Sequence, residues 1–185
     1  WAAAHGTGGA VDGDLDLAFN ACEIVRTHML RPTWHLVAPE DIRWIQELTA
    51  PRVHATNAFI YRQQELDARL LKEIDRMLAR FLAGAVYLTR SEVATRLEEA
   101  GIAAARIRLA YMVMHAELNA VVCSGPLRGR QHTYALLDER VPATRRLERE
   151  EALAELAERY FTSHGPAQLQ DMAWWSGLTA RGVRA

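Results

Sequence analysis

The order of predicted elements between residues 66 and 137 constrains the fold of this chain more than any other feature. Three helical segments, at 66–84, 89–101 and 105–119, follow one another through short connections, with apolar residues at three- and four-residue spacing. The pattern then changes to that of a β-hairpin over 121–137. Helix, helix, helix and hairpin in this order is the arrangement of a winged helix-turn-helix module.

Residues at the helix ends support these boundaries. Thr89 and Glu92 have capping-box spacing, so that a hydroxyl and a carboxylate can satisfy opposed backbone amides where a helix begins. Gly84 and Gly101 stand where the first two helices are expected to end.

Parts of the same pattern recur on both sides of this segment. Before it, a short helix at 14–21 precedes a hairpin over 24–37, and a further helix begins near Pro39. After it, amphipathic helices cover 149–161 and 167–176. Such repetition predicts several modules in tandem.

The sequence therefore predicts a mainly α protein with small β-hairpins, an α+β fold of tandem winged helix-turn-helix modules. Residues 1–50 are expected to hold the C-terminal part of a first module and the following helix. Residues 51–141 are expected to form the complete central module, and residues 142–185 the start of a third. Because the chain begins at Trp1 and ends at Ala185 inside the repeat, we expect truncation at both ends.

Composition and charge bound the class of the protein. Half of the 185 residues are hydrophobic and 24% are charged, as expected for a globular chain with a core. No apolar run approaches the roughly 20 residues of a bilayer span, so we expect no membrane segment. Cys22 and Cys123 lie in apolar surroundings and indicate free thiols in a reducing, cytoplasmic compartment. The net charge of -1 gives no argument for a polyanionic partner.

No motif indicates a metal or cofactor site. The seven histidines are scattered without ligand spacing, and there is no paired-cysteine or H-E-x-x-H motif. Nucleophile-elbow, P-loop and dinucleotide fingerprints are lacking as well. The segment from His5 to Gly9 is glycine-rich but follows no predicted strand, so we expect a loop there. We therefore expect neither a metal ion nor a cofactor.

The hairpin of the central module has cations on its turn. Arg128, Arg130, Gln131 and His132 surround a glycine, which lets a turn approach a phosphate backbone closely. The alternative is a solvated turn with two ordinary arginines. Residues 105–135 hold four arginines against one acid, and the wing of a winged helix is a DNA-contacting element. We therefore predict DNA contact here.

The helix before this hairpin is too apolar to lie free in a groove of DNA. Apolar side chains, among them Ile107, Leu109, Met112 and Val113, crowd most of its circumference. A helix that is largely buried cannot read base edges in the major groove. Arg106, near its start, remains a candidate contact.

The first hairpin also joins cationic and polar residues, with no acid between residues 26 and 37. Strand alternation is expected to place Thr33 and His35 on one face, and Trp34 and Leu36 on an apolar face that docks on a core. The alternative is that the histidines only satisfy local carbonyl groups. The candidate DNA contacts on this hairpin are Arg26, His28, Arg31, Thr33 and His35.

Several stretches of the chain together resemble one family. They are IVRTHMLRPTWHLVAPEDIRW at 24–44, LTAPRV at 48–53, CSGP at 123–126, TYALLDERV at 133–141, YFTSHGP at 160–166 and AWWSGL at 173–178. They resemble the bacterial winged-helix DNA-binding proteins that include the AlkZ-like DNA glycosylases. The resemblance implies tandem winged helices and damaged duplex DNA as the partner. In the characterised enzymes it implies hydrolysis of the N-glycosidic bond of alkylated or cross-linked bases.

The same resemblance bears on catalysis. The catalytic signature of the family is a short Gln-x-Gln or Gln-x-Asp motif that positions a water, and it normally lies ahead of a tryptophan matching Trp1. Gln168-Leu-Gln170 has the right letters in the wrong module. The resemblance therefore implies no catalytic residue in this chain, which we expect to be inactive by itself. It also places the first hairpin near the catalytic cleft.

Three hypotheses about function remain open at this point. In the first, the intact protein is a DNA repair glycosylase, and this chain supplies its DNA-binding scaffold. In the second, it is a non-catalytic DNA-binding or regulatory protein on the same scaffold. In the third, it is a helical module for protein partners. Both DNA-binding hypotheses predict a cytoplasmic protein associated with the nucleoid.

Overall fold

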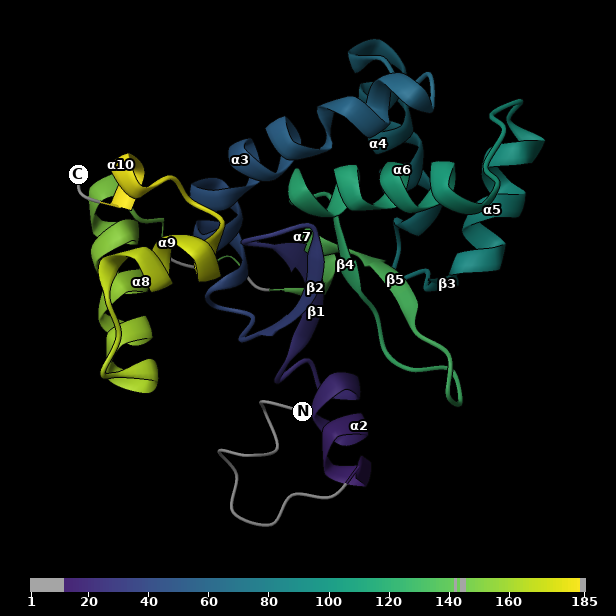
Figure 1. Cartoon of the computed structure of the whole chain (residues 1–185). Coiled ribbons are helices and arrows are strands. Elements are labelled where there is room, and N and C mark those ends of the chain that lie inside the picture. The colour runs from purple at the N-terminus through teal and green to yellow at the C-terminus, as the bar shows by residue number, and fades with distance from the viewer. Residues whose placement is uncertain (1–11, 142, 144–145, 184–185) are drawn as a thin grey trace.

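Helices dominate the described part of the chain, and two small antiparallel sheets lie between them (Figure 1). The computed structural model describes residues 12–141, 143 and 146–183, so that Trp1 and the segment from His5 to Gly9 lie outside the described residues. The helices are α2 Asp12–Asn20, α3 Ile42–Gln63, α4 Ala68–Leu82, α5 Arg90–Glu99, α6 Arg106–Leu118, α7 Leu137–Arg140, α8 Arg149–His164, α9 Leu169–Ser176 and α10 Ala180–Val183. The strands are β1 Val25–Met29, β2 Thr33–Val37, β3 Leu88–Thr89, β4 Val122–Ser124 and β5 Thr133–Leu136. The mainly helical α+β class is therefore the one that the sequence predicts.

The central segment has the predicted order of elements. Helices α4, α5 and α6 are followed by β4 and β5, and Thr89 and Glu92 form the expected capping box where α5 begins. The sequence pattern does not predict β3, because two residues are too few to show a strand period. This strand pairs with β5, which gives the sheet order β3-β5-β4 and ties the start of α5 to the hairpin.

One long helix, α3, connects the first hairpin to the central segment. Pro51 lies inside it without ending it, and its 22 residues run through the boundary expected between residues 50 and 51. Its first half packs in a hydrophobic core with the first hairpin, α8 and α9, while Tyr61 near its end belongs to a second core around α4–α6. A small cluster formed by α3 and α6 consists of Ala50, Val53, Met114 and Leu118. Helix α3 is therefore common to both cores.

The C-terminal helices pack against the first half of α3 and the first hairpin (Figure 1). Trp44 of α3 is buried, and its indole N–H donates to Asp41 at 2.9 Å. The Asp41 carboxylate also accepts from Arg159 of α8. Gly177, which follows α9, has a φ of +72°, and a Cβ there would collide with the carbonyl oxygen of Leu30. This close approach holds the end of α9 against the turn of the hairpin.

Candidate nucleic-acid interface

The two hairpins predicted to contact DNA lie side by side. Strand β1 of the first hairpin is next to β4 of the second, and the backbone N–H of Arg26 donates to Ser124 Oγ at 2.8 Å. This bond joins residues that are 98 positions apart in the sequence. Four of the predicted contact residues therefore line one groove of about 640 Å³, and they are Arg26, Arg106, Gln131 and His132.

This interhairpin groove is basic and partly apolar. Its walls come from both hairpins and from the regions where α5 and α6 begin, and they also include Trp34, Arg90, Ser91, Leu109 and Tyr134. Among the described residues that line it, three are arginines and none has a carboxylate. A groove with cations set in walls of low polarity attracts a polyanion.

The Arg26 guanidinium lines the groove without a full set of partners. It lies over the Trp34 ring, 4.2 Å from the ring centroid, as in a cation–π pair. Burial lowers the Arg26 pKa, and Nε is buried with no hydrogen-bond acceptor among the described residues. An unpaired buried donor costs about 1–3 kcal/mol. An acceptor group entering the groove would therefore be stabilised at this point.

Buried polar contacts behind Trp34 attach the first hairpin to α6. The rings of His28 and Trp34 are 5.1 Å apart between centroids, and His28 Nδ1 forms a hydrogen bond with the Glu117 carboxylate. Gln46 of α3 adds a bond to Thr27 at 3.0 Å. The structure thus places His28, a predicted DNA contact, inside the protein, where 8% of it is exposed. His28 packs against the Trp34 ring and links the first hairpin to Glu117 of α6.

The first hairpin exposes residues that the sequence assigns to a core-facing side. Trp34 and Leu36 were expected to be covered, but they are 47% and 37% exposed. Strand β1 contacts α3, α6 and β4, whereas β2 is the edge strand. Alternation decides which residues share a face, but neighbouring elements decide whether that face is covered. The expectation is therefore wrong for these two residues.

The two arginines of the second hairpin have different surroundings. Arg128 Nη1 lies 2.7 Å from the Glu92 carboxylate, and Nη2 donates to the carbonyl oxygen of Tyr87 at 2.6 Å. The backbone N–H of Thr89 and the Arg128 guanidinium hold the pKa of Glu92 at about 2. Arg130 is exposed and makes no hydrogen bond or ion pair with a described residue. Arg128 thus ties the hairpin to α5, while Arg130 is available to a ligand.

A second cleft, of about 520 Å³, lies between α2 and the second hairpin. Arg130 and His132 line it together with Arg26 and Phe19 of α2. The His132 ring meets the Phe19 ring edge-on at 5.7 Å, and Nδ1 is buried without a partner among the described residues. Burial, with the nearby charge of Arg26, lowers the His132 pKa. The imidazole is therefore neutral at pH 7 and can both donate and accept.

The remaining predicted contacts lie near the turn of the first hairpin, outside the interhairpin groove. Arg31 lies over the ring of Trp174 from α9, 4.9 Å from its centroid. His35 Nδ1 donates to the carbonyl oxygen of Thr33 at 3.0 Å, and burial lowers the His35 pKa. His35 thus makes the local carbonyl bond that the alternative for the hairpin histidines expects.

Comparison with known proteins identifies the family. The sequence model described as AlkZ-like, DNA glycosylase AlkZ-like, matches residues 1–185. The chain belongs to the AlkZ-like DNA glycosylase family.

Structure comparison gives the fold. The solved structure of Streptomyces sahachiroi DNA glycosylase AlkZ matches with a TM-score of 0.73 and 23% sequence identity. The match covers 92% of this chain and 48% of that one, so the chain spans about half the length of the solved protein. Comparison with curated protein sequences gives no match.

Gln168-Leu-Gln170 has the Gln-x-Gln sequence of the catalytic motif that the family resemblance implies, so its place in the structure bears on catalysis. Gln168 is the N-cap of α9 and shares a capping box with Asp171, and neither glutamine lines the interhairpin groove. Within the described residues, no group of three His, Cys, Asp or Glu is placed to hold a metal ion, and both cysteines are free. No helix in this part of the chain has the length and apolar character of a membrane span.

The structure adds groove residues that the sequence argument missed. Arg90 and Ser91 enter the groove from the first turn of α5. The capping box at Thr89 could have identified them, because it marks where the exposed amides of that helix begin. Tyr134 had no such signal, because its place depends on the pairing of β5 with β3 and β4.

Proposed function

We propose that this chain is the DNA-binding scaffold of a DNA glycosylase. In this proposal it holds damaged duplex DNA while residues outside the chain excise an alkylated or cross-linked base. The observation that carries the proposal is the interhairpin groove, where Arg26, Arg106, Gln131 and His132 converge without a carboxylate in the lining. Membership of the AlkZ-like DNA glycosylase family supports it.

The proposal includes a tandem winged-helix architecture. Helices α4, α5 and α6 with the β4–β5 hairpin would be the three helices and the wing of a central module. The first hairpin with α2 would end a first module, and α8 to α10 would begin a third. We assign these modules to residues 1–50, 51–141 and 142–185, with α3 shared between the first two.

Phosphates are the expected targets of the exposed contacts. Arg130 and Gln131 are exposed on the turn of the second hairpin, and Arg106 is exposed where α6 begins. A guanidinium can bind a phosphate through two parallel N–H donors. Most of α6 beyond Arg106 is covered by other elements, so it cannot enter a major groove. Binding should therefore depend little on base sequence.

Base excision by this chain alone is not expected. Hydrolysis of a glycosidic bond passes through an oxocarbenium-like state and needs a group that aims a water at it, commonly a carboxylate. Among the described residues lining the groove, Gln131 offers an amide and none offers a carboxylate. The purified chain should bind alkylated duplex without releasing base. Release of free base, measured by chromatography, would contradict this part of the proposal.

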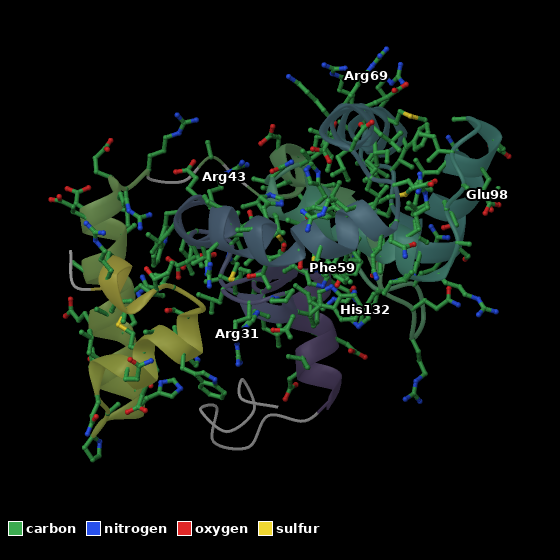
Figure 2. The ribbon with its side chains drawn as sticks, turned by 45° about the horizontal axis from the view of Figure 1, so that its top comes forward. Arg31, Arg43, Phe59, Arg69, Glu98 and His132 are labelled. Atoms are coloured by element: carbon green, nitrogen blue, oxygen red, sulfur yellow. The ribbon has the colours of Figure 1, made fainter. Side chains whose placement is uncertain are left out.

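The salt dependence of duplex binding tests the scaffold role. Binding of a short fluorescent duplex is followed by anisotropy between about 50 and 200 mM salt. Each phosphate contact contributes about 0.9 to the slope of log affinity against log salt, so Arg130→Ala should reduce that slope by about 1. Arg69→Ala is the matched control, because Arg69 is exposed on α4 (Figure 2) and lines neither the interhairpin groove nor the second cleft, which Arg130 lines. An unchanged slope for Arg130→Ala, or equal losses in both variants, would refute the assignment.

A further inference from the structure

The interhairpin groove has an aromatic surface that a paired duplex does not engage. At about 640 Å³ the groove falls within the range of small-molecule pockets, about 300–1,000 Å³. Trp34 contributes an exposed ring, and Leu109 and Ala104 contribute apolar wall. The bases of a duplex are stacked on one another, so their faces are not available to such a ring. A base must leave the stack to reach it.

We propose that the groove binds one unpaired nucleotide of the DNA, with its base against Trp34 and its phosphate between Arg90 and Arg106. The inference rests on the proposed function, because the nucleotide belongs to the bound DNA. An aromatic ring beside cations suits a nucleotide, since every base has a π-face and guanidinium groups bind phosphate.

The phosphate end of the groove is formed where two helices begin. Arg90 is the first residue of α5, and its Nη2 donates to the carbonyl oxygen of Arg106 at 3.0 Å. Arg106 has a φ of 48°, in the left-handed region that residues other than glycine rarely adopt. Backbone strain of this kind persists where neighbouring contacts hold it, and it is common at binding sites. The Arg90 bond therefore holds the backbone of Arg106 beside the first residue of α5, so that both arginines line this end of the groove.

The base end of the groove is preorganised. The Arg26 guanidinium lies 4.2 Å from the centroid of the Trp34 ring, and the His28 ring lies 5.1 Å from it. His28 is itself fixed by Glu117 inside the protein. About half of Trp34 is still exposed, at 47%. Arg26 covers one face of the ring, so a base would stack on the part that stays exposed, and a ring that is already fixed loses little side-chain entropy when it does.

Polar groups without partners lie beside the ring. Gln131 and His132 line the same groove as Trp34. His132 Nδ1 and Arg26 Nε are both buried, and neither has a hydrogen-bond partner among the described residues. Buried polar atoms are nearly always paired in folded proteins. Beside the exposed Trp34 ring, these groups offer polar partners to the edge of a base that stacks there.

Three fluorescent DNAs of one sequence test the inference on the whole chain. The first is fully paired, the second has a single bulged adenosine, and the third has an abasic residue at the bulge. Stacking of a base on an aromatic ring should make the base bulge bind about 10-fold more tightly than the other two. The abasic bulge keeps the phosphate and the flexibility of the bulge, so it separates stacking from DNA bending.

Variants assign the effect to Trp34. Trp34→Leu should abolish the difference between the base bulge and the abasic bulge, while Trp34→Phe keeps a ring and should keep most of it. Phe59→Ala is the control, because Phe59, labelled in Figure 2, is an exposed aromatic residue of α3 and is not among the residues that line the groove. It should leave the difference unchanged. Circular dichroism shows whether each variant is folded.

Two outcomes would overturn the inference. One is equal binding of the base bulge and the abasic bulge by the unaltered chain, which needs no variant to be informative. The other is a preference for the base bulge that survives in folded Trp34→Leu. Both outcomes leave duplex binding in place, whereas failure to bind all three DNAs contradicts the proposed function itself.

Discussion

The coupling free energy between His28 and Glu117 measures how strongly this contact holds the first hairpin on α6. The two side chains are 10% and 1% exposed, and a hydrogen bond to a charged group contributes about 1.5–3 kcal/mol. Glu117 Oε1 is buried without a hydrogen-bond partner among the described residues, so removing the carboxylate also recovers desolvation energy. A single substitution therefore changes both the hydrogen-bond energy and the desolvation energy of the buried carboxylate. The cycle of His28→Ala, Glu117→Ala and the double variant isolates the pair, for which we expect a coupling of about 2 kcal/mol.

Urea unfolding, followed by tryptophan fluorescence, gives the free energy of unfolding of the four chains. A loss of about 2 kcal/mol corresponds to a fall in Tm of about 4–8 °C for a chain of this size. The comparison pair is His115 and Asp75, whose side chains are 15% and 13% exposed and should couple less strongly. A coupling below about 0.5 kcal/mol for His28 and Glu117 would refute the argument that this pair fixes the hairpin.

Two further predictions concern the stability of the whole chain. Gly177→Ala should lower Tm more than Gly84→Ala, because both positions have a positive φ, which costs roughly 1–2 kcal/mol, but only at Gly177 does a Cβ meet backbone. Equal shifts in thermal unfolding would contradict this. Burial lowers the pKa values of His35, His54 and His132, so the unfolded chain binds more protons than the folded one. The free energy of unfolding should therefore fall as pH drops below about 6.5, and urea titrations that show a rise would contradict it.

The secondary structure was largely predictable because it depends on neighbours in the sequence. Apolar spacing and the Thr89–Glu92 capping box indicate helices and their ends from a few adjacent residues. The first hairpin was expected over 24–37, and its strands cover 25–29 and 33–37. Strand β3 was missed, because its two residues are too few to show the alternation of exposed and buried side chains that identifies a strand.

The candidate site was only partly predictable, because residues of one type differ in their distant contacts. Arg128 and Arg130 are equivalent in sequence, yet Glu92 and the Tyr87 carbonyl engage Arg128 and leave Arg130 open. Trp34 was assigned to a covered face and lines the groove instead. No pattern within a hairpin contains this information.

The sequence by itself therefore determined the α+β class, the order of helices and hairpins, the family resemblance, and the two turns richest in cations. Only the tertiary structure decided that both hairpins share one groove, that His28 is buried, and that Trp34 faces outward. The physical reason is the range of the interactions. Helix periods and caps act within one or two turns, whereas the groove depends on contacts such as Arg26 to Ser124, across 98 residues of chain.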